Sequence, residues 1–365
     1  MAPLLGNGDG YGAYQTLGNL TITYDGFGEY DSYRRELDLE TGIYTTVVKT
    51  GDTEISTSVY CSYPDEVCIY HITSNEDALE ITIGFENRLI EPETAEFSCG
   101  EGHVRVKGVT QVGPPEGLRY DAVARVTGCS GATTSCSDDS KLTITAPEGK
   151  KSLTVVVGAG TNFDQTKGNA ENDYSFKGPD PSDYVETITE AAAAKNYKSL
   201  YNTYLEDYQR LSSAFVLDLP DTHGSADKET SGVIEAYTVD SSGDPYLEGL
   251  LFDYSRHLLI TSSRPGSLPA NLQGRWTEEL WPAWSADYHA NINLQMNYWV
   301  ADQTGLSETQ DGLWDYMELN WVPRGTETAK LLYNADGWVV HNEMNIYGFT
   351  AMKNGEGWAH CELSL

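Results

Sequence analysis

The chain has few basic residues. It carries 23 Lys and Arg against 55 Asp and Glu, so its formal net charge at pH 7 is −32. A surface of this charge repels the phosphates of nucleic acids and of anionic lipids, and it suits a neutral ligand. The sequence also has no run of about 18 consecutive apolar residues, the length that a membrane-spanning helix needs. We therefore expect no nucleic-acid partner and no membrane partner, and the composition does not define an oligomeric state.

Several common catalytic motifs are missing as well. The sequence has no Gly-x-Ser-x-Gly nucleophile elbow, no HExxH zinc motif and no Gly-Lys-Ser/Thr phosphate loop, and its seven histidines show no metal-ligand spacing. The glycine-rich stretch at 6–12 has no flanking strand and helix, so we interpret it as a turn. The first ten residues, MAPLLGNGDG, lack the basic and apolar regions of a signal peptide. We expect neither a bound metal nor an organic cofactor from these motifs.

The cysteines nevertheless suggest an oxidising compartment. Cys61 and Cys68 flank SYPDEV, and Cys129 and Cys136 flank SGATTS. Cysteines that bracket a short loop between adjacent strands suit a disulfide, so we predict the pairs 61–68 and 129–136. Free buried thiols are the alternative. Disulfides would indicate an extracellular protein.

The pattern up to residue 166 is that of a β-domain. Short segments rich in Val, Ile, Thr and Tyr alternate with Gly, Pro, Asp or Ser clusters, which predicts antiparallel sheets packed as a sandwich. The predicted strands are NLTITY, IYTTVV, EVCIYHI, LEITIGF, HVRVKG, KLTITA and SLTVVVGAG.

Residues 167–235 are predicted to form a helical linker. After a polar break at 167–182, Asp183 can cap a helix with Glu186 three residues on. One apolar stripe then recurs at helical spacing, which favours packing against a neighbour over ligand binding. The stripe consists of Tyr197, Tyr201, Tyr204, Tyr208 and Leu211.

Residues 236–365 are predicted to be helical. We expect helices at 245–260, 293–303, 308–320 and 323–333. Because short loops would join them, consecutive helices should be antiparallel.

One dense constellation of polar and aromatic residues stands out at 285–299, SADYHANINLQMNYW. His289, Asn291, Asn293 and Asn297 can donate and accept hydrogen bonds without a full charge. The aromatic residues around them are Trp281, Trp284, Tyr288, Tyr298 and Trp299. Broad aromatic faces with polar neighbours suit a sugar, whose ring has apolar faces and a rim of hydroxyls.

The spacing of these residues predicts a common direction. In an extended segment His289, Asn291 and Asn293 would project to one side. Asn293 would cap the following helix, and Asn297 would lie on the same helical face. An Asn can orient a water molecule, but a carboxylate must take the water's proton. The alternative is structural, with the Asn residues as helix caps and His289 as a satisfied core residue.

Residues 262–299, SSRPGSLPANLQGRWTEELWPAWSADYHANINLQMNYW, resemble the signature of glycoside hydrolase family 95, the α-L-fucosidases. Further matches run through nearly all of residues 14–358. They are YQTLGNLTI, YRRELDLETG, DYQRL, DPYLEGLLFDYSRHLLI, VPRGTETAKLLY and GWVVHNEMNIYG.

The resemblance implies a fold and a reaction. The fold would be an N-terminal antiparallel β-super-sandwich (1–166), a helical linker (167–235) and the first part of an (α/α)6 catalytic barrel (236–365). The reaction would be hydrolysis of terminal α-L-fucosides in fucosylated oligosaccharides or glycans, with α-1,2 links preferred and with inversion. It implies a secreted protein that needs no metal or organic cofactor.

The resemblance also implies roles for individual residues. The family's His-x-Asn-x-Asn motif falls on His289, Asn291 and Asn293, where the two Asn residues position the attacking water and the His contacts fucose. Further candidate substrate-binding residues are Trp276, Trp284, Asp287, His341 and Asn345. Core packing is the alternative for His341 and Asn345.

The sequence departs from the family pattern in its carboxylates. An inverting glycosidase needs a general acid and a general base on opposite faces of the sugar. The family's two carboxylates come well after the Asn motif, and none of Glu278, Glu279, Glu343 and Glu356 matches them. Residues 360–365, HCELSL, are also unlike the family, and the match begins partway into the β-domain. We therefore expect a fragment, truncated at both ends and with little activity of its own.

Three alternatives to a fucosidase of this kind stay open. The chain could be a non-catalytic protein that binds fucose-type or galactose-type sugars. It could be the nonfunctional product of an incorrect gene model. Within the enzyme class, α-L-galactosides are an alternative substrate, because L-galactose differs from L-fucose only by a hydroxyl at C6.

Overall fold

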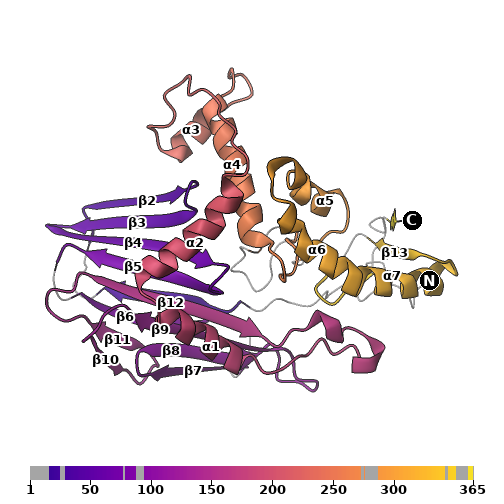
Figure 1. Cartoon of the computed structure of the whole chain (residues 1–365), viewed down its shortest axis with the longest axis horizontal. Helices are drawn as coiled ribbons and strands as arrows, with labels where there is room; N and C mark the ends of the chain where they lie inside the picture. The colour runs from indigo at the N-terminus through magenta and orange to yellow at the C-terminus, as the bar shows by residue number, and fades with distance from the viewer. Residues whose placement is uncertain are drawn as a thin grey trace.

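The structure is a computed structural model with two parts, a β-sandwich followed by a helical region (Figure 1). It describes residues 16–24, 29–76, 79–87, 94–272, 275, 287–341 and 344–350, and the backbone of 361–364. No helix among these residues is both long and apolar enough to cross a membrane.

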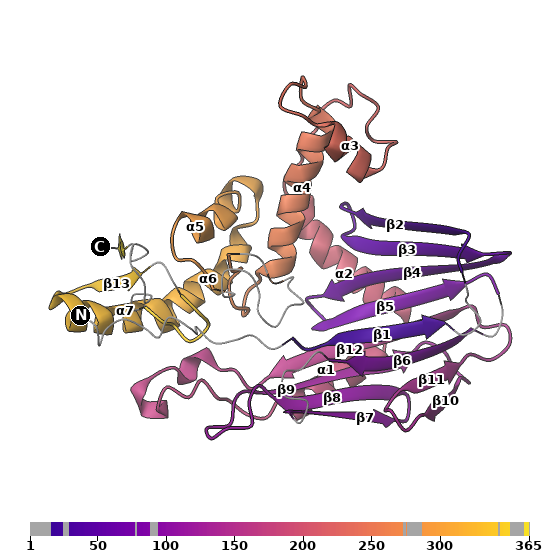
Figure 2. The ribbon, with the colours of Figure 1, turned by 180° about the vertical axis from the view of Figure 1, so that it is seen from behind.

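The sandwich consists of two antiparallel sheets. The larger has eight strands in the order β2-β3-β4-β5-β12-β9-β8-β7, and the smaller has four in the order β1-β6-β11-β10. Figure 2 shows the smaller sheet lying across one face of the larger. The strands are β1 (Asn19–Tyr24), β2 (Ser32–Asp38), β3 (Ile43–Thr50), β4 (Thr53–Ser62), β5 (Val67–Ser74), β6 (Glu80–Glu86), β7 (Ala95–Gly100), β8 (His103–Val109), β9 (Arg119–Thr127), β10 (Thr133–Cys136), β11 (Leu142–Thr145) and β12 (Ser152–Thr161).

A closed apolar core lies between the two sheets. Alternate residues of each strand point inward, so Ile81 and Ile83 of β6 meet Ile72 of β5 and Val155 of β12, and all four are fully buried. This arrangement confirms the predicted sandwich, and each of the seven predicted strands is present.

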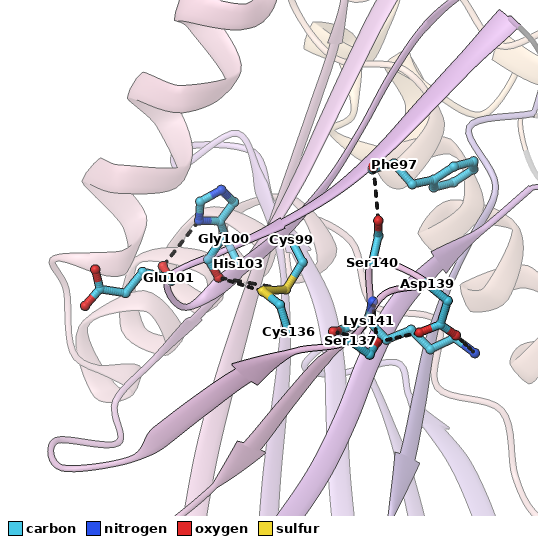
Figure 3. Close-up of a disulfide and its surroundings, with 10 residues drawn as sticks. All are labelled: Phe97, Cys99, Gly100, Glu101, His103, Cys136, Ser137, Asp139, Ser140 and Lys141. Carbon is cyan, nitrogen blue, oxygen red and sulfur yellow. Dashed lines mark hydrogen bonds and ion pairs between the residues drawn. A yellow bond between two sulfur atoms is a disulfide. The ribbon is translucent and has the colours of Figure 1, made fainter.

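The two disulfides have different roles. Cys61 and Cys68 face each other across β4 and β5 and are bonded, as predicted. The second predicted pair is wrong, because Cys136 bonds to Cys99 instead. Cys99 lies in β7 at the edge of one sheet, and Cys136 ends β10 at the edge of the other, so this bond joins the two sheets (Figure 3). Cys129 carries a free thiol and packs against the sandwich core.

The linker forms two helices on the outer face of the larger sheet, α1 (Ser182–Ala193) and α2 (Tyr197–Ser212) (Figure 1). The predicted Asp183 cap is wrong, because Pro181 precedes the helix and Asp183 lies in its first turn. Glu186 does not reach back to a cap either, since it pairs with Arg105 and Arg125 of the sheet. The salt bridges of the sheet therefore determine where this carboxylate points.

The tyrosine stripe of α2 packs on the sandwich, as its spacing indicates. Tyr204, Tyr208 and Leu211 are buried, and the Tyr197 ring stacks on His71 of β5 at 3.5 Å. Gly42, in the β2–β3 turn, has φ +66° and lies so close to α2 that an added Cβ would come within 2.5 Å of the Tyr204 hydroxyl. The missing side chain thus lets this turn contact the linker.

The helical region begins with α3 (Thr230–Ala236) and α4 (Pro245–Ser262). Asp244 caps α4 by accepting a hydrogen bond from the Leu247 amide at 3.2 Å. The region continues with α5 (Ile292–Tyr298), α6 (Asp311–Tyr316), α7 (Val322–Thr328), β13 (Trp338–His341) and β14 (Cys361–Ser364).

The last two predicted helices are a single helical run. Between Asp311 and Tyr333 the chain stays helical, with one π-helical stretch at Met317–Trp321 and another at Ala329–Tyr333. The expected loop and antiparallel pairing are therefore wrong here. Pro323 lies in the first turn of α7, directly after a π-helical stretch, where its missing amide hydrogen does not break the helix.

Candidate sugar-binding site

A sharp corner of the backbone at 287–291 carries the central residues of the predicted site. Asp287 is fully buried, and its carbonyl accepts a hydrogen bond from the Leu272 amide at 3.2 Å. The Tyr288 amide donates to the Met344 carbonyl at 2.8 Å. Two segments remote in sequence therefore hold the start of the corner.

Asp287 fixes the orientation of His289. One oxygen of its carboxylate accepts hydrogen bonds from the His289 amide and, at 2.9 Å, from Nδ1 of the imidazole. With the proton on Nδ1, Nε2 is the acceptor nitrogen of the ring. His289 itself has φ +46°, a left-handed conformation that costs energy for a residue with a side chain.

Asn291, and not Asn293, is the cap of α5. Its side-chain oxygen accepts a hydrogen bond from the Asn293 amide at 3.0 Å, while its own amide donates to the His289 carbonyl at 2.7 Å. The predicted extended segment is therefore wrong, since the chain turns at His289 and Asn293 already lies in the first turn of the helix. The simple alternation that placed all three side chains on one side does not apply.

Asn297 has a structural partner. Its side-chain amide donates to the Asn271 carbonyl at 3.2 Å, which ties α5 to the segment that follows α4. Asn293 and Asn297 lie four residues apart on α5 and so share a helical face, as predicted, but neither lines the pocket described below.

A pocket of about 540 Å³ opens beside Asn291. Its volume is in the range of small-molecule sites. The pocket wall combines indole rings with amide groups, the mixture that suits a sugar, but it does not include His289 or Asn293. The aromatic and polar residues of the wall are Asn291, Gln295, Tyr298, Trp299, Asp302, Gln303, Gln310, Trp314, Trp321 and Trp338.

Most of this wall was not predicted from the sequence. Trp314 and Trp321 belong to the helical run, Trp338 to β13, and Gln310 donates to Asp302 at 2.8 Å. The signal that was available is the clustering of all eight tryptophans after residue 275. It indicated an aromatic region but not which rings share one cavity.

His341 and Asn345, two other predicted substrate-binding residues, do not line this pocket. Buried His341 has both ring nitrogens engaged, Nδ1 with the Thr350 carbonyl at 2.6 Å and Nε2 with the Tyr333 hydroxyl at 2.8 Å. The Asn345 side chain accepts from the amides of Tyr347 and Phe349 at 3.0 and 3.2 Å. These bonds organise the chain after β13. Trp276 and Trp284 lie outside the described residues.

No group of three or more His, Cys, Asp or Glu side chains in the described part of the chain is arranged to hold a metal ion. The described residues of the site offer hydrogen-bonding groups, aromatic faces and one buried carboxylate–imidazole pair.

Residues 196–364 match the catalytic domain of glycosyl hydrolase family 95, and residues 2–166 match the N-terminal domain of glycosyl hydrolase family 65. Residues 196–364 are therefore similar to the family 95 catalytic domain, in agreement with the resemblance seen in the sequence.

Curated relatives match over most of this chain. The chain is 51% identical to a probable alpha-fucosidase A of Aspergillus oryzae over 95% of its own length and 48% of the relative. It is 32% identical to alpha-L-fucosidase 2 of Arabidopsis thaliana, again over 95% of this chain and over 43% of the relative. The chain thus spans about half the length of the curated relatives it matches.

A solved structure supports the fold alone. A putative kojibiose phosphorylase from human microbiome aligns with a TM-score of 0.53 at 13% identity, over 93% of this chain and 40% of that one. The shared feature is a β-sandwich followed by helices.

Proposed function

We propose that this chain supplies the sugar-holding part of an extracellular α-L-fucosidase. The enzyme would release terminal α-L-fucose, preferably α-1,2-linked, from oligosaccharides or glycans by inverting attack of water. The observation that carries the proposal is the Asp287–His289–Asn291 corner beside a tryptophan-lined pocket, within a family 95 catalytic segment. The helices from α4 onward would form the first part of an (α/α)6 barrel.

Each residue of the corner has a proposed role. His289, oriented by Asp287, accepts a hydrogen bond from a fucose hydroxyl through Nε2. Asn291 and Asn293 orient the attacking water, whose proton passes to a carboxylate, while a second carboxylic acid protonates the leaving oxygen. Trp276 and Trp284 are proposed as further contacts with the sugar, whereas His341 and Asn345 would act indirectly, by ordering the chain after β13.

One observation favours sugar binding without hydrolysis as the second candidate function. Of the described residues that line the pocket, Asp302 is the sole carboxylate, and it accepts a hydrogen bond from Gln310. Asp287 is already committed to His289. A pair of free carboxylates on opposite faces of a sugar, which an inverting mechanism needs, is not among these lining residues.

The test measures binding and turnover on the same purified chain. Ligand-observed NMR with L-fucose reports binding, and fucose release from 2′-fucosyllactose reports hydrolysis. Release supports the fucosidase, binding without release supports the second candidate, and the absence of both rejects the two proposals together. L-galactose is the matched ligand that tests whether a hydroxyl at C6 is accepted.

Asn291→Ser isolates the role of the amide. Serine also caps helices, so α5 should remain folded while the ligand-facing amide is lost. We expect roughly fivefold to tenfold weaker fucose binding, as for one lost hydrogen bond. The matched control is Asn196→Ser, at the cap of α2, where the same exchange should leave binding unchanged.

A further inference from the structure

The segment 263–272, between α4 and the corner, is bonded to the candidate site along its length. The Ala270 amide donates to the Tyr298 hydroxyl at 2.9 Å, and the Ser263 hydroxyl lies 3.0 Å from the same oxygen. Burial raises the pKa of Tyr298, so this phenol stays neutral. At its far end the segment donates from Leu272 to the Asp287 carbonyl. Its position therefore decides where Asp287, and with it His289, can lie.

Arg264 anchors the start of this segment. The residue is 8% exposed, and one terminal nitrogen of its side chain contacts both carboxylate oxygens of Asp207 on α2, at 2.8 and 2.9 Å. Glu308 adds a third anionic contact at 3.4 Å. Backbone packing is tight here too, because a Cβ on Gly312 of α6 would come within 2.6 Å of the Ser267 carbonyl.

The β-sandwich reaches the same anchor through Tyr63. Its ring lies 4.0 Å from the central carbon of the Arg264 guanidinium, a cation–π geometry. Its hydroxyl donates to the Pro265 carbonyl at 3.0 Å, across a separation of 202 residues in sequence. Tyr63 occupies the β4–β5 turn, at the end of the sandwich that faces the helical region (Figure 2).

The β4–β5 turn is itself held firmly. The Cys61–Cys68 disulfide closes it, and the Ser62 hydroxyl donates to Asp65 at 2.7 Å. Asp65 is buried and forms an ion pair with Lys195, between α1 and α2. A turn that is fixed in this way can transmit a defined position to the residues that it contacts.

We propose that Tyr63 and Arg264 are positioning residues for the sugar-binding corner. They set segment 263–272 against the sandwich and against α2, and this segment sets the orientation of the Asp287–His289 pair. The β-domain thus contributes to the site through one tyrosine without lining the pocket. The role in sugar recognition rests on the proposed function, whereas the role in ordering the corner does not.

Four variants separate the contacts. Tyr63→Phe removes only the bond to Pro265, and Tyr63→Leu also removes the aromatic face. Arg264→Lys keeps the charge but loses the planar guanidinium, and Arg264→Met removes both. The Met variant should fold, because Arg210 still pairs with Asp207 and Glu308. Tyr33→Leu, an exposed tyrosine of β2, is the matched control.

Hydrogen–deuterium exchange of the full chain is the first measurement. In Tyr63→Leu and Arg264→Met we expect amides of residues 287–298 to exchange at least about fivefold faster, while β6 and β12 stay as in the wild type. Tyr63→Phe and Arg264→Lys should lie in between, and Tyr33→Leu should match the wild type. Unchanged exchange at 287–298 would overturn the proposal, as would an equal loss of protection in β6 and β12.

L-fucose affinity is the second measurement. The proposal expects the variants to weaken binding in the same order as they speed exchange, with Tyr33→Leu unaffected. Variants that speed exchange at 287–298 but keep wild-type affinity would overturn the role in recognition. If the wild type itself does not bind fucose, the proposed function fails, and the exchange result still decides whether Tyr63 and Arg264 order the corner.

Discussion

The β-sandwich and the helical region use their apolar residues differently. Between the two sheets the inward-facing side chains are almost fully buried, as Ile81 and Ile83 are. In the helical region large apolar side chains remain in contact with solvent, including Trp299 at 58% exposure and Leu331 at 73%. The sandwich thus closes its own core, whereas the described helices leave apolar surface uncovered. Since buried apolar area is the main source of stability, the two regions should not be equally stable.

The distribution of tryptophan makes this comparison measurable. All eight tryptophans follow residue 275, so their fluorescence reports on the helical region, whereas the β-signal in circular dichroism is dominated by the sandwich. We expect the fluorescence transition to come at a lower urea concentration than the β-sheet transition. Coincident transitions would show that the two regions unfold as one unit.

The largest effect is expected from a core truncation in the sandwich. Ile83→Ala removes a fully buried side chain between the sheets and should cost about 2–5 kcal/mol of unfolding free energy. Met296→Ala, at a position 47% exposed on α5, should cost much less. Urea unfolding followed by circular dichroism measures both. If both variants lose the same unfolding free energy, the sandwich core is not more closed than the helical region.

The disulfide between the sheets should give the next largest effect. Replacing Cys99 and Cys136 together by Ser opens a link between residues 37 apart and should cost about 2–4 kcal/mol. Cys129→Ser should change stability far less, because that thiol is free. Peptide mapping of the non-reduced protein gives the pairing directly. A Cys129–Cys136 peptide would reverse this assignment.

The smallest effect concerns the contact between the sandwich and α2, and it is measured at acidic pH. Burial lowers the pKa of His71 to about 4 from its ordinary 6.5, so the folded state favours the neutral ring. The contribution of the neutral His71 ring to the unfolding free energy is therefore complete above pH 6.5. It is lost as the pH falls toward 4, because the unfolded chain takes up the proton first. His71→Gln should show a shallower loss of stability over this window than the wild type. If the unfolding free energies of the variant and the wild type fall in parallel with pH, His71 does not contribute to the loss of stability.

Seven strands could be predicted because their segments are rich in β-branched and aromatic residues. SLTVVVGAG is a long apolar run because β12 is buried on both faces, between the smaller sheet and α1. Five strands of the sandwich, β2, β4, β7, β9 and β10, were not predicted. In β2 and β10 nearly all residues are exposed, so the sequences SYRRELD and TTSC carry no apolar alternation. Their strand conformation comes from pairing with β3 and β11, which is a tertiary effect.

In the candidate site, too, the sequence predicted the identity of the residues but not their geometry. The identity of its central residues could be read from the sequence, because HANIN is specific. The geometry could not, since the left-handed backbone at His289 is imposed by contacts with Leu272 and Met344, remote in the chain. The pocket wall likewise depends on how α5, α6 and β13 meet, which no local pattern encodes.

Gly42 has a consequence for mutational tolerance. Two successive hairpin turns contain a left-handed glycine, Gly42 at φ +66° and Gly51 at φ +58°. Nothing lies within 4 Å of a Cβ placed on Gly51, so asparagine, which accepts this conformation, is an allowed replacement there. At Gly42 the same replacement would collide with two tyrosines of α2. Two turns of nearly the same shape therefore accept different sets of residues, and a mutational scan should find one permissive and the other invariant.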